Sequence, residues 1–526
     1  MKRSFYLGCA LLAAAAAVRF PFLSIRPMHT DEAVHAVKLG HLLETGLYKY
    51  EPLEYHGPTL YYFTWLGARL AGIRSLEGLS ENLLRGITAL AGLGVVLTPW
   101  LTAPYIGKRA AFFASVLLAF SPAFVYYSGY FIHEIWLVLF LGFFLGGLCR
   151  YWEKPRLGWA VWTGLSAGLM FATKETAVLS FVSAALAFLF LWGRSLGHER
   201  SIRLLDAAVG SGVFLLVWLL FFSGFGTHWQ GLFDSLRSLW LYPSHAAVKT
   251  AHFHPWWYYL DLLTWTEFFE PVVWNEDGIV ALALLGSLIV LRNQRKSSVF
   301  SGASFLVLFT LILTICYSVI PYKTPWNVLP LLYGMVLPAG LAADRFLRWA
   351  RGRKEHLIGL TLLLLFGLVS PLAQSLLLMT RYTTSPSNPY VYGHTSSDIF
   401  SMFQKVQQIA KDSGQGRRLY IQVFAENDDY WPWPWYLRSF PSVGYFSEVD
   451  PSISAAALIL ADARLEPEIL KYLYETPPPG QRPLYLPLFD APVYLRPSLE
   501  WRGYIRKDLL DLMQAGESAP ETKRAR

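Results

Sequence analysis

Met28–Ala36 carries the densest group of side chains able to do acid–base chemistry. Asp31, Glu32, His29 and His35 fall within seven residues, directly after the first apolar segment. A carboxylate in such a position can act as a general base that removes the proton of a hydroxyl group, or it can bind a divalent cation through oxygen. Acidic residues after an apolar segment are often only solvated, but the flanking sequence here stays apolar and aromatic. We therefore expect one of the two acids to be functional, with the choice between them open.

Residue spacing leaves a metal site as an alternative in the same segment. If Thr30 caps a helix, Asp31 and His35 stand four residues apart on one face of that helix. The candidate ligands are acidic or histidine side chains: Asp31, His35, His29, His56 and Glu134. Because no recognised ligand spacing fits these residues, the sequence allows a divalent cation without requiring one.

Four further polar clusters lie between apolar segments: Tyr55–Thr59, His133–Glu134, Thr173–Thr176 and Tyr322–Trp326. His56 lies beside a Gly-Pro turn, where it could line a site or simply meet water. Glu134 could face a substrate, or it could only complement the dipole of the helix that it begins.

Two lysines in these clusters could hold a phosphate. A Lys-Glu pair between apolar segments should be paired or functional, so Lys174 could stabilise a phosphate while Glu175 orients or neutralises that lysine. Prolines on both sides fix the turn Tyr322–Trp326, which carries Lys323 to the depth of the lipid headgroups. Lys323 is then either an interfacial lysine beside a tryptophan or a phosphate clamp.

The composition is that of a polytopic membrane protein. Hydrophobic residues make up 54% of the 526 residues and charged residues 16%, against about 25% charged in soluble domains. The net charge of +8 is weak evidence for nucleic acid, because Lys and Arg fall mostly in short loops, where they set orientation. Cys9, Cys149 and Cys316 lie in or beside apolar segments, which argues against a disulfide framework or a zinc site.

Apolar segments of about 20 residues predict about eleven membrane spans. We place them at 4–22, 83–103, 109–127, 132–150, 157–172, 175–193, 204–223, 277–292, 299–319, 325–347 and 356–379. The first segment could instead be a cleaved signal peptide, but the later spans alternate only if it is retained. The short basic loops then all fall on one side, which predicts a plasma-membrane protein with a cytoplasmic N-terminus and an extracytoplasmic C-terminus.

The composition changes after residue 380, where Ser, Thr and Pro indicate a linker. Hydrophobic patterning then predicts a helix, two buried strands and a second helix at Ile399–Ile409, Arg418–Phe424, Ala455–Leu460 and Glu466–Leu473. The expected organisation is mainly α: a membrane domain over 1–380, a linker over 381–397, a small extracytoplasmic α/β domain over 398–510 and a disordered tail over 511–526.

Together these motifs resemble the GT-C superfamily of membrane glycosyltransferases, which includes dolichyl-phosphate-mannose–protein mannosyltransferases and bacterial aminoarabinose transferases. The shared pattern is an acid soon after the first span, helices in the membrane interface within that loop, and a lipid-phosphate sugar donor. Leu60–Ala71 predicts such an interfacial helix. The likeness is closer to a bacterial and archaeal branch often labelled flippase-activity-associated. Its motifs recur here as His29–Ala33, His56–Pro58, Tyr322–Trp326 and Trp431–Arg438.

The resemblance implies transfer of a sugar from a polyprenyl-phosphate donor to a hydroxyl of a glycan, lipid or protein at the extracytoplasmic face. Asp31 would be the general base, or Glu32 in its place. Lys174 and Lys323, with Tyr322, would bind the donor phosphate. The residues that would position the sugar or the acceptor are acidic or histidine: His56, Glu134, Glu175 and His29.

Two other functions stay open at this point. A non-enzymatic factor that translocates or assembles lipid-linked oligosaccharides should carry polar residues in the middle of its spans, whereas Asp206 and Gln374 lie near span ends. A structural subunit would bind partners through its outer domain. In that domain Trp431–Trp435 could stack on sugars, anchor the domain or fill its core.

Overall fold

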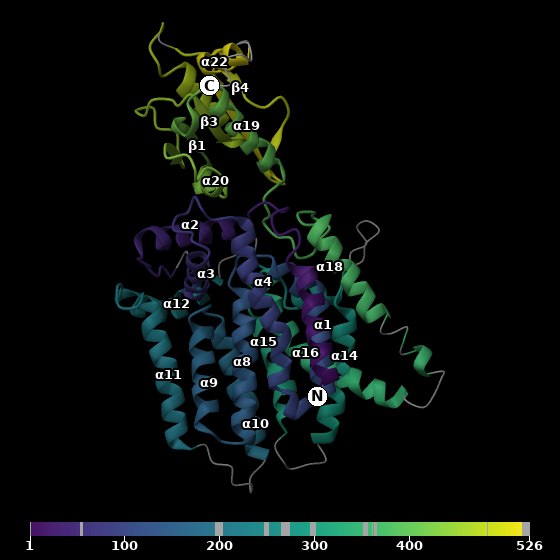
Figure 1. Ribbon diagram of the computed structural model, residues 1–526. Coiled ribbons are helices and arrows are strands. Elements are labelled where there is room, and N and C mark those ends of the chain that lie inside the picture. The colour runs from purple at the N-terminus through teal and green to yellow at the C-terminus, as the bar shows by residue number, and fades with distance from the viewer. Residues whose placement is uncertain are drawn as a thin grey trace. The chain divides into compact units, whose positions relative to one another are not determined.

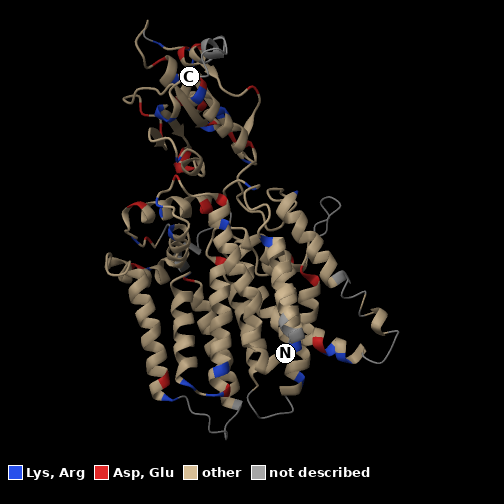
Figure 2. Ribbon diagram, in the orientation of Figure 1, with Lys and Arg blue, Asp and Glu red and all other residues tan. Residues whose placement is uncertain are grey.

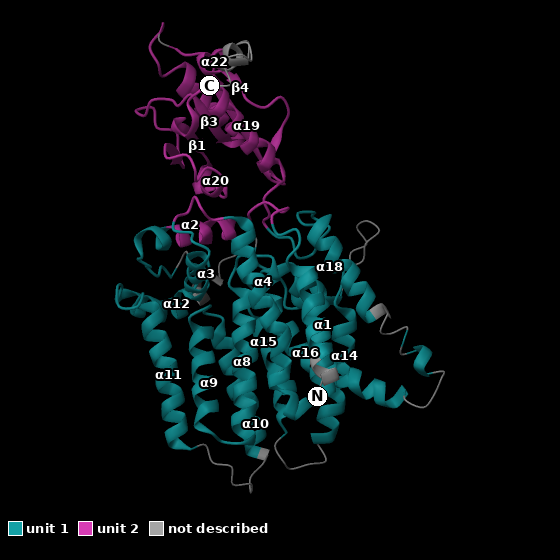
Figure 3. Cartoon of the chain, in the orientation of Figure 1, with its two compact units in different colours: residues 1–23, 41–74, 80–392 teal, residues 24–40, 75–79, 393–526 magenta. Residues whose placement is uncertain are grey.

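The structure is a computed structural model that describes residues 2–52, 56–194, 203–246, 252–264, 274–294, 301–350, 356–359, 361, 365–480 and 482–517. The chain forms two compact units, drawn in two colours in Figure 3. Unit 1 comprises residues 1–23, 41–74 and 80–392, and unit 2 comprises residues 24–40, 75–79 and 393–526. Each unit is thus assembled from segments that are distant in the sequence.

Unit 1 is helical (Figure 1). Its longer helices are α1 (Lys2–Arg19), α3 (Thr59–Leu70), α4 (Glu81–Leu97), α6 (Lys108–Phe120), α8 (Glu134–Glu153), α9 (Leu157–Phe171), α10 (Ala177–Arg194), α11 (Leu204–Phe222), α12 (Gln230–Ala246), α14 (Asp277–Gln294), α15 (Gly302–Val319), α16 (Leu329–Ala350) and α18 (Ser370–Thr380). Its short helical segments are η1 (Thr98–Leu101), α5 (Ala103–Ile106), α7 (Pro122–Ser128), α13 (Tyr258–Thr264), η2 (Pro325–Val328) and η3 (Leu365–Val369). Helix α2 (Thr30–Thr45) begins in unit 2 and ends in unit 1.

Six helices in the described ranges are long and apolar enough to cross a membrane, or seven if the bent pair α6–α7 is one span. The six are α4 with η1, α8, α11, α14, α15, and η2 with α16. Shorter apolar helices lie at Tyr6–Arg19, Leu157–Phe171, Ala177–Gly193 and Gly367–Thr380, where further spans were expected. The mainly helical membrane fold is therefore confirmed, whereas the count of about eleven spans is not.

Neighbouring helices of unit 1 pack closely. Helix α9 packs against both α8 and α11, and α16 packs against α6 and α14. At the α9–α11 contact, a Cβ atom on Gly164 would lie 2.0 Å from the carbonyl oxygen of Gly210. Small residues at such crossings let two helix backbones approach each other within a membrane.

Basic residues mark one end of several helices in unit 1 (Figure 2). Arg150 lies in the last turn of α8, Arg156 precedes α9, and Arg203 precedes α11. The same end of the bundle therefore carries the basic loops that predicted its orientation. The predicted basic residues at 195–202, 295–300 and 351–355 lie outside the described residues.

Unit 2 holds a six-stranded mixed sheet in the order β2-β1-β3-β6-β4, with β5 also paired to β6. Its strands are β1 (Ile421–Phe424), β2 (Val443–Phe446), β3 (Leu458–Asp462), β4 (Tyr485–Pro487), β5 (Val493–Arg496) and β6 (Leu499–Arg506). Its helices are α19 (Asp398–Asp412), α20 (Trp433–Tyr436), α21 (Glu466–Tyr474) and α22 (Lys507–Glu517). The two predicted strands are found as β1 and β3, and the two predicted helices as α19 and α21.

The core of unit 2 explains the tryptophan-rich motif. Strands β1 and β3 are buried along their whole length, as expected for central strands covered on both faces. Trp433 and Trp435 are fully buried, and the ring centroid of Trp433 lies 5.7 Å from that of Trp501. Of the three roles considered for this motif, core filling is therefore the one found for Trp433 and Trp435.

Candidate active site

The segment before and at the start of α2 holds Glu32 in a fixed position. Glu32 is the third residue of the helix, and its Oε2 accepts a hydrogen bond from the backbone N–H of His29 at 3.0 Å. This is the glutamate half of a capping box, which satisfies a free N–H group at a helix start. The other oxygen, Oε1, lies 3.2 Å from Nη2 of the buried Arg26. The Glu32 side chain is fully buried, so both of its oxygens are occupied by the protein.

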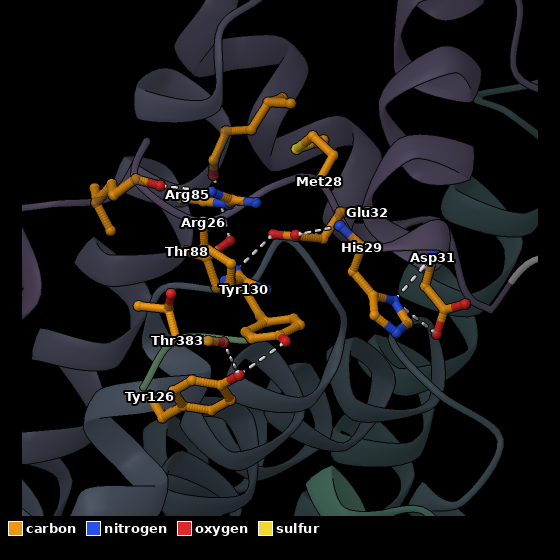
Figure 4. Close-up of polar contacts among 12 residues, drawn as sticks. Arg26, Met28, His29, Asp31, Glu32, Arg85, Thr88, Tyr126, Tyr130 and Thr383 are labelled. Atoms are coloured by element: carbon orange, nitrogen blue, oxygen red, sulfur yellow. Dashed lines mark hydrogen bonds and ion pairs between the residues drawn. The ribbon is translucent and has the colours of Figure 1, made fainter. Parts of the chain in front are cut away.

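Asp31, the neighbouring acid, has a different environment (Figure 4). Its side chain is 45% exposed, and its Oδ2 lies 4.0 Å from Nδ1 of His29. The same Nδ1 accepts a hydrogen bond from the backbone N–H of Asp31 at 3.1 Å. Figure 4 shows the two carboxylates pointing away from each other. Asp31 is therefore the acid that can meet a substrate, whereas Glu32 maintains the start of the helix.

Two further histidines lie in unit 2. His35 is buried. Burial, together with the charges of His29 and Arg26, lowers the pKa of His394 to about 4, so His394 is neutral at neutral pH. Arg26 is then the cation that balances the buried charge of Glu32.

The His56 turn packs against the Lys174 turn in unit 1. The backbone N–H of Gly57 donates to the carbonyl of Thr173 at 3.1 Å, and that of Thr59 donates to Ala172 at 3.1 Å. A Cβ atom on Gly57 would lie 2.2 Å from the Ala172 carbonyl oxygen, so only glycine fits there. The two motifs, more than a hundred residues apart in sequence, thus form one structure. Tyr55, which precedes His56, lies outside the described residues.

Glu175 is buried in this structure and is paired with His56. Its Oε2 accepts from Nδ1 of His56 at 2.9 Å, and its Oε1 accepts from the hydroxyl of Tyr50 at 2.9 Å. Burial alone would raise the pKa of the Glu175 carboxyl, but the charge and hydrogen bond of His56 outweigh it, and the net effect lowers the pKa. Glu175 is therefore an ionised carboxylate that orients His56, rather than the counterion of Lys174.

Lys174 pairs instead with Glu134 at the start of α8. Its Nζ contacts Oε1 of Glu134 and donates to Oδ1 of Asn327 at 3.0 Å. Lys174 and Glu134 are both almost fully buried. This ion pair neutralises the lysine, so its charge is already compensated by the protein. Asn327 directly follows the predicted Tyr322–Trp326 turn, and its contact with Lys174 was not expected from the sequence.

Among the described residues, Lys323 has no such counterion. It is fully buried, and its Nζ donates to two backbone carbonyls, that of Ile320 and that of His254 at 3.3 Å. Within the described ranges no carboxylate forms an ion pair with it. Burial lowers the pKa of its ammonium group. A buried cation held only by carbonyl dipoles favours an anionic ligand.

The segment that follows residue 251 completes the surroundings of Lys323. Phe253 and Tyr322 form an antiparallel bridge, and the backbone N–H of Lys323 donates to the carbonyl of His252 at 2.9 Å. The ring of Tyr322 lies 4.8 Å from that of His252. Burial, and then the charges of Lys323 and His252, lower the pKa of His254. Tyr322 thus supports the loop that fixes Lys323.

Glu276 is a buried acid that the sequence analysis did not single out. Its Oε1 accepts from the hydroxyl of Ser121 at 2.5 Å and from the backbone N–H of Ala123 at 3.1 Å. These groups lie at the 59° bend between α6 and α7, so Glu276 caps the start of α7. Its Oε2 is buried without a hydrogen-bond partner in the described chain. The available signal was the acidic pair Glu276-Asp277 at the edge of an apolar segment; Asp31-Glu32 is a similar pair, but it follows its apolar segment.

Glu276 should make the stability of the protein depend on pH. Burial, opposed by its bonds to Ser121 and Ala123, raises its pKa from 4.5 to about 7. The folded state thus binds this proton more tightly than the unfolded chain. The resulting stabilisation, on the order of 3 kcal/mol, is complete below pH 4.5 and is lost as the pH rises through 7.

Replacing Glu276 by glutamine should remove this dependence. Between pH 5 and pH 8 the melting temperature of the wild type should fall relative to that of Glu276→Gln, measured in detergent by intrinsic fluorescence. Glu475→Gln, which changes an exposed carboxylate after α21, should follow the wild type. Parallel curves for the wild type and Glu276→Gln would contradict the raised pKa.

The candidate metal ligands do not gather into a metal site. In the part of the chain that the structure describes, no group of three or more His, Cys, Asp and Glu side chains is arranged to hold a metal ion. Glu134 is paired with Lys174, and His35 is buried in unit 2. The predicted site residues form two sets instead: His29, Asp31 and Glu32 in unit 2, and His56, Glu134, Lys174, Glu175, Tyr322 and Lys323 in unit 1.

Comparison with known proteins identifies the fold. Residues 55–221 match a family model described as dolichyl-phosphate-mannose-protein mannosyltransferase. ArnT from Cupriavidus metallidurans, solved with bound undecaprenyl phosphate, is 16% identical and superposes with a TM-score of 0.62 over 94% of this chain and 97% of its own. The oligosaccharyltransferase AglB from Archaeoglobus fulgidus, solved with an inhibitory peptide and a dolichol-phosphate, is 11% identical, with a TM-score of 0.59 over 88% of this chain and 69% of its own. No curated protein sequence matches the chain.

These matches confirm the resemblance that the motifs predicted. The chain therefore has the fold of ArnT and AglB, and residues 55–221 are similar to the mannosyltransferase family model. Its closer likeness to the flippase-activity-associated branch stays a prediction.

Proposed function

We propose that this protein transfers a sugar from a polyprenyl-phosphate donor to an acceptor hydroxyl, with Asp31 as the general base. The fold similarity to ArnT bound to undecaprenyl phosphate, over nearly the whole of both chains, is the observation that carries this proposal. AglB, with its bound dolichol-phosphate, supports the same class of donor. The acceptor is a hydroxyl group of a glycan, a lipid or a protein.

The proposed reaction moves one proton and one glycosyl group. Asp31 takes the proton of the acceptor hydroxyl as its oxygen forms a bond to the anomeric carbon of the sugar. The bond between that carbon and the phosphate oxygen breaks, and its electron pair leaves with the polyprenyl phosphate. Lys323 stabilises the negative charge that grows on the leaving phosphate. Its lack of a carboxylate partner in the described ranges makes it a better candidate than Lys174.

The other predicted residues take supporting roles in this proposal. Glu32 holds the helix start that presents Asp31, through its bonds to His29 and Arg26. Glu175 orients His56, whose side chain is 26% exposed and can contact the substrate. Glu134 fixes Lys174, and both support the turn at Asn327.

The reaction takes place, in this proposal, at the extracytoplasmic face of the plasma membrane. The basic residues at the ends of α8, α9 and α11 support a cytoplasmic location for that end of the bundle. The Lys174 turn follows the opposite end of α9, which runs from Leu157 to Phe171.

The direct test is a transfer assay with purified protein in liposomes. Polyprenyl-phosphate sugars labelled in the sugar should lose that label to acceptor fractions when the wild-type protein is present. Accessibility of the donor to an external glycosidase, measured in parallel, reports lipid movement across the bilayer. Movement of the donor without any transfer of label would replace this proposal with translocation, and would remove Asp31 as a base.

A further inference from the structure

The backbone of Met28, three residues before Asp31, is bound on both sides by the C-terminal part of unit 2. The hydroxyl of Tyr436 accepts from the N–H of Met28 at 3.0 Å. The hydroxyl of Thr395 donates to the carbonyl of Met28 at 2.7 Å. Met28 itself is fully buried. Both backbone groups of one residue are thus fixed by side chains more than 360 residues away in sequence.

Arg496 binds the side chain of Thr30, two residues after Met28. Its Nη2 donates to Oγ1 of Thr30 and to the carbonyl of Trp431, both at 3.0 Å. Its Nη1 forms an ion pair with Asp429. The guanidinium is planar and carries its donors in a fixed fork. Arg496, at the end of β5, therefore ties Thr30 to the turn that leads into the tryptophan motif.

The contacts of Tyr436, Thr395 and Arg496 have a role that differs from the capping of α2. The start of α2 is capped from within, since Glu32 binds the N–H of His29 and the ring of His29 binds the N–H of Asp31. Those bonds stabilise the first helical turn. The bonds from Tyr436, Thr395 and Arg496 satisfy groups outside that cap. They fix where the turn lies within unit 2, not whether it forms.

The Trp431–Arg438 motif acquires a role from this arrangement. Its two buried tryptophans anchor α20 in the core, and the guanidinium of Arg438 stacks on Trp435 at 3.8 Å from the ring centroid. Arg438 also donates to the carbonyl of Leu79 at 3.1 Å. Tyr436 then projects from a rigid helix, so its hydroxyl is held in one place. A group on a rigid support fixes its partner more precisely than one on a loop.

We propose that Tyr436, Thr395 and Arg496 are positioning residues for Asp31, and that the Trp431–Arg438 motif exists to hold Tyr436. This inference rests on the proposed function, because it gives these three residues the role of placing a general base. A base must lie within hydrogen-bond reach of the hydroxyl that it deprotonates, and a displacement of about 1 Å can reduce the rate about a hundredfold.

Two variants that each remove one bond test the inference. Tyr436→Phe loses the hydroxyl that binds the Met28 N–H, and Thr395→Val loses the one that binds the Met28 carbonyl. Each should lower kcat at least about tenfold and leave the KM for the donor lipid within about twofold, because the base does not bind that lipid. Exchange of the backbone amides of residues 29–33 with deuterium should become faster in both variants.

Tyr474→Phe is the matched control. The Tyr474 hydroxyl likewise binds both backbone groups of one residue, Tyr485, at 2.9 and 3.2 Å. Neither of these two hydrogen bonds involves residues 24–40. It should show wild-type kcat and wild-type exchange at residues 29–33, while its melting temperature falls about as much as that of Tyr436→Phe.

The two measurements separate the two hypotheses. If the wild-type protein transfers no sugar, the proposed reaction is rejected. Faster exchange at residues 29–33 in the variants would then show that these side chains fix the segment, but not that they position a base. Active wild type with unchanged kcat in Tyr436→Phe and Thr395→Val would overturn the positioning role alone. A fall in kcat that Tyr474→Phe reproduces would also overturn it, because loss of domain stability would then be the cause.

Discussion

Asp31→Asn is expected to abolish sugar transfer while the protein stays folded and inserted in the membrane. The substitution keeps the size and shape of the side chain but removes the carboxylate that takes the acceptor proton. General-base catalysis typically contributes about a hundredfold to ten-thousandfold, and kcat should fall by that amount. The Asp31 side chain is 45% exposed, and its one ion pair with a described residue is the 4.0 Å approach to His29, so loss of the carboxylate should hardly change the melting temperature.

The neighbouring acid supplies the control for this result. Glu32→Gln removes a charge one residue further along, but Glu32 is fully buried and pairs with Arg26. Breaking a buried pair leaves the partner charge uncompensated, which typically costs about 3–5 kcal/mol. Glu32→Gln should therefore lower the melting temperature, and Asp31→Asn should not. The assignment of the base fails if Asp31→Asn retains wild-type kcat.

Lys323→Met is expected to have the second-largest effect on transfer. Methionine keeps the length of the side chain but removes the ammonium group that binds the donor phosphate. Removing one group that stabilises developing negative charge typically lowers kcat about a hundredfold to a thousandfold. Because the same group also contacts the phosphate before reaction, binding of the polyprenyl phosphate alone should weaken too. Calorimetric titration with that lipid measures the binding separately from the chemistry.

Lys174→Met shows which lysine holds the phosphate. Lys174 is paired with the buried Glu134, so its removal should destabilise the protein strongly. In the part of the chain that the structure describes, Lys323 binds only backbone carbonyls, so Lys323→Met should alter the melting temperature much less. Equal affinity for polyprenyl phosphate in Lys323→Met and wild type would exclude Lys323 from the phosphate site.

Residue type and spacing were sufficient for the mainly helical fold class and for the choice of segments, but not for the number of spans. Length and apolarity identified the helices, and the Asp31-Glu32 pair, the Gly57 turn and the Lys323 turn were recognised as motifs. The role of each acid within its pair was not predictable, because it depends on direction. Glu32 points to Arg26 and Asp31 to solvent, and adjacent residues on a helix face different ways.

Contacts between segments that are distant in the sequence also could not be predicted. Sequence order suggested that Glu175 would neutralise Lys174, whereas Glu134 does so across 40 residues. Glu276 was overlooked because its partners, Ser121 and Ala123, lie about 150 residues earlier. The number of spans was uncertain for a different reason. Hydropathy fixes apolar length, whereas the bend at Ser121 divides one apolar stretch into two helices.

The discontinuity of unit 2 has a consequence for how the protein is made. Met28 leaves the ribosome 367 residues before Thr395 and 408 residues before Tyr436. At about 5–20 residues per second, the amino-terminal segment waits roughly 20–80 s for the side chains that bind it. Throughout that time the helices of unit 1 can insert, but Asp31 has not reached its final place. A chain cut short after Lys323 but before Thr395 by translational arrest or proteolysis would thus contain Asp31 and Lys323 but would lack the two side chains that bind Met28. In such a chain the proposed base would be present without being held in place.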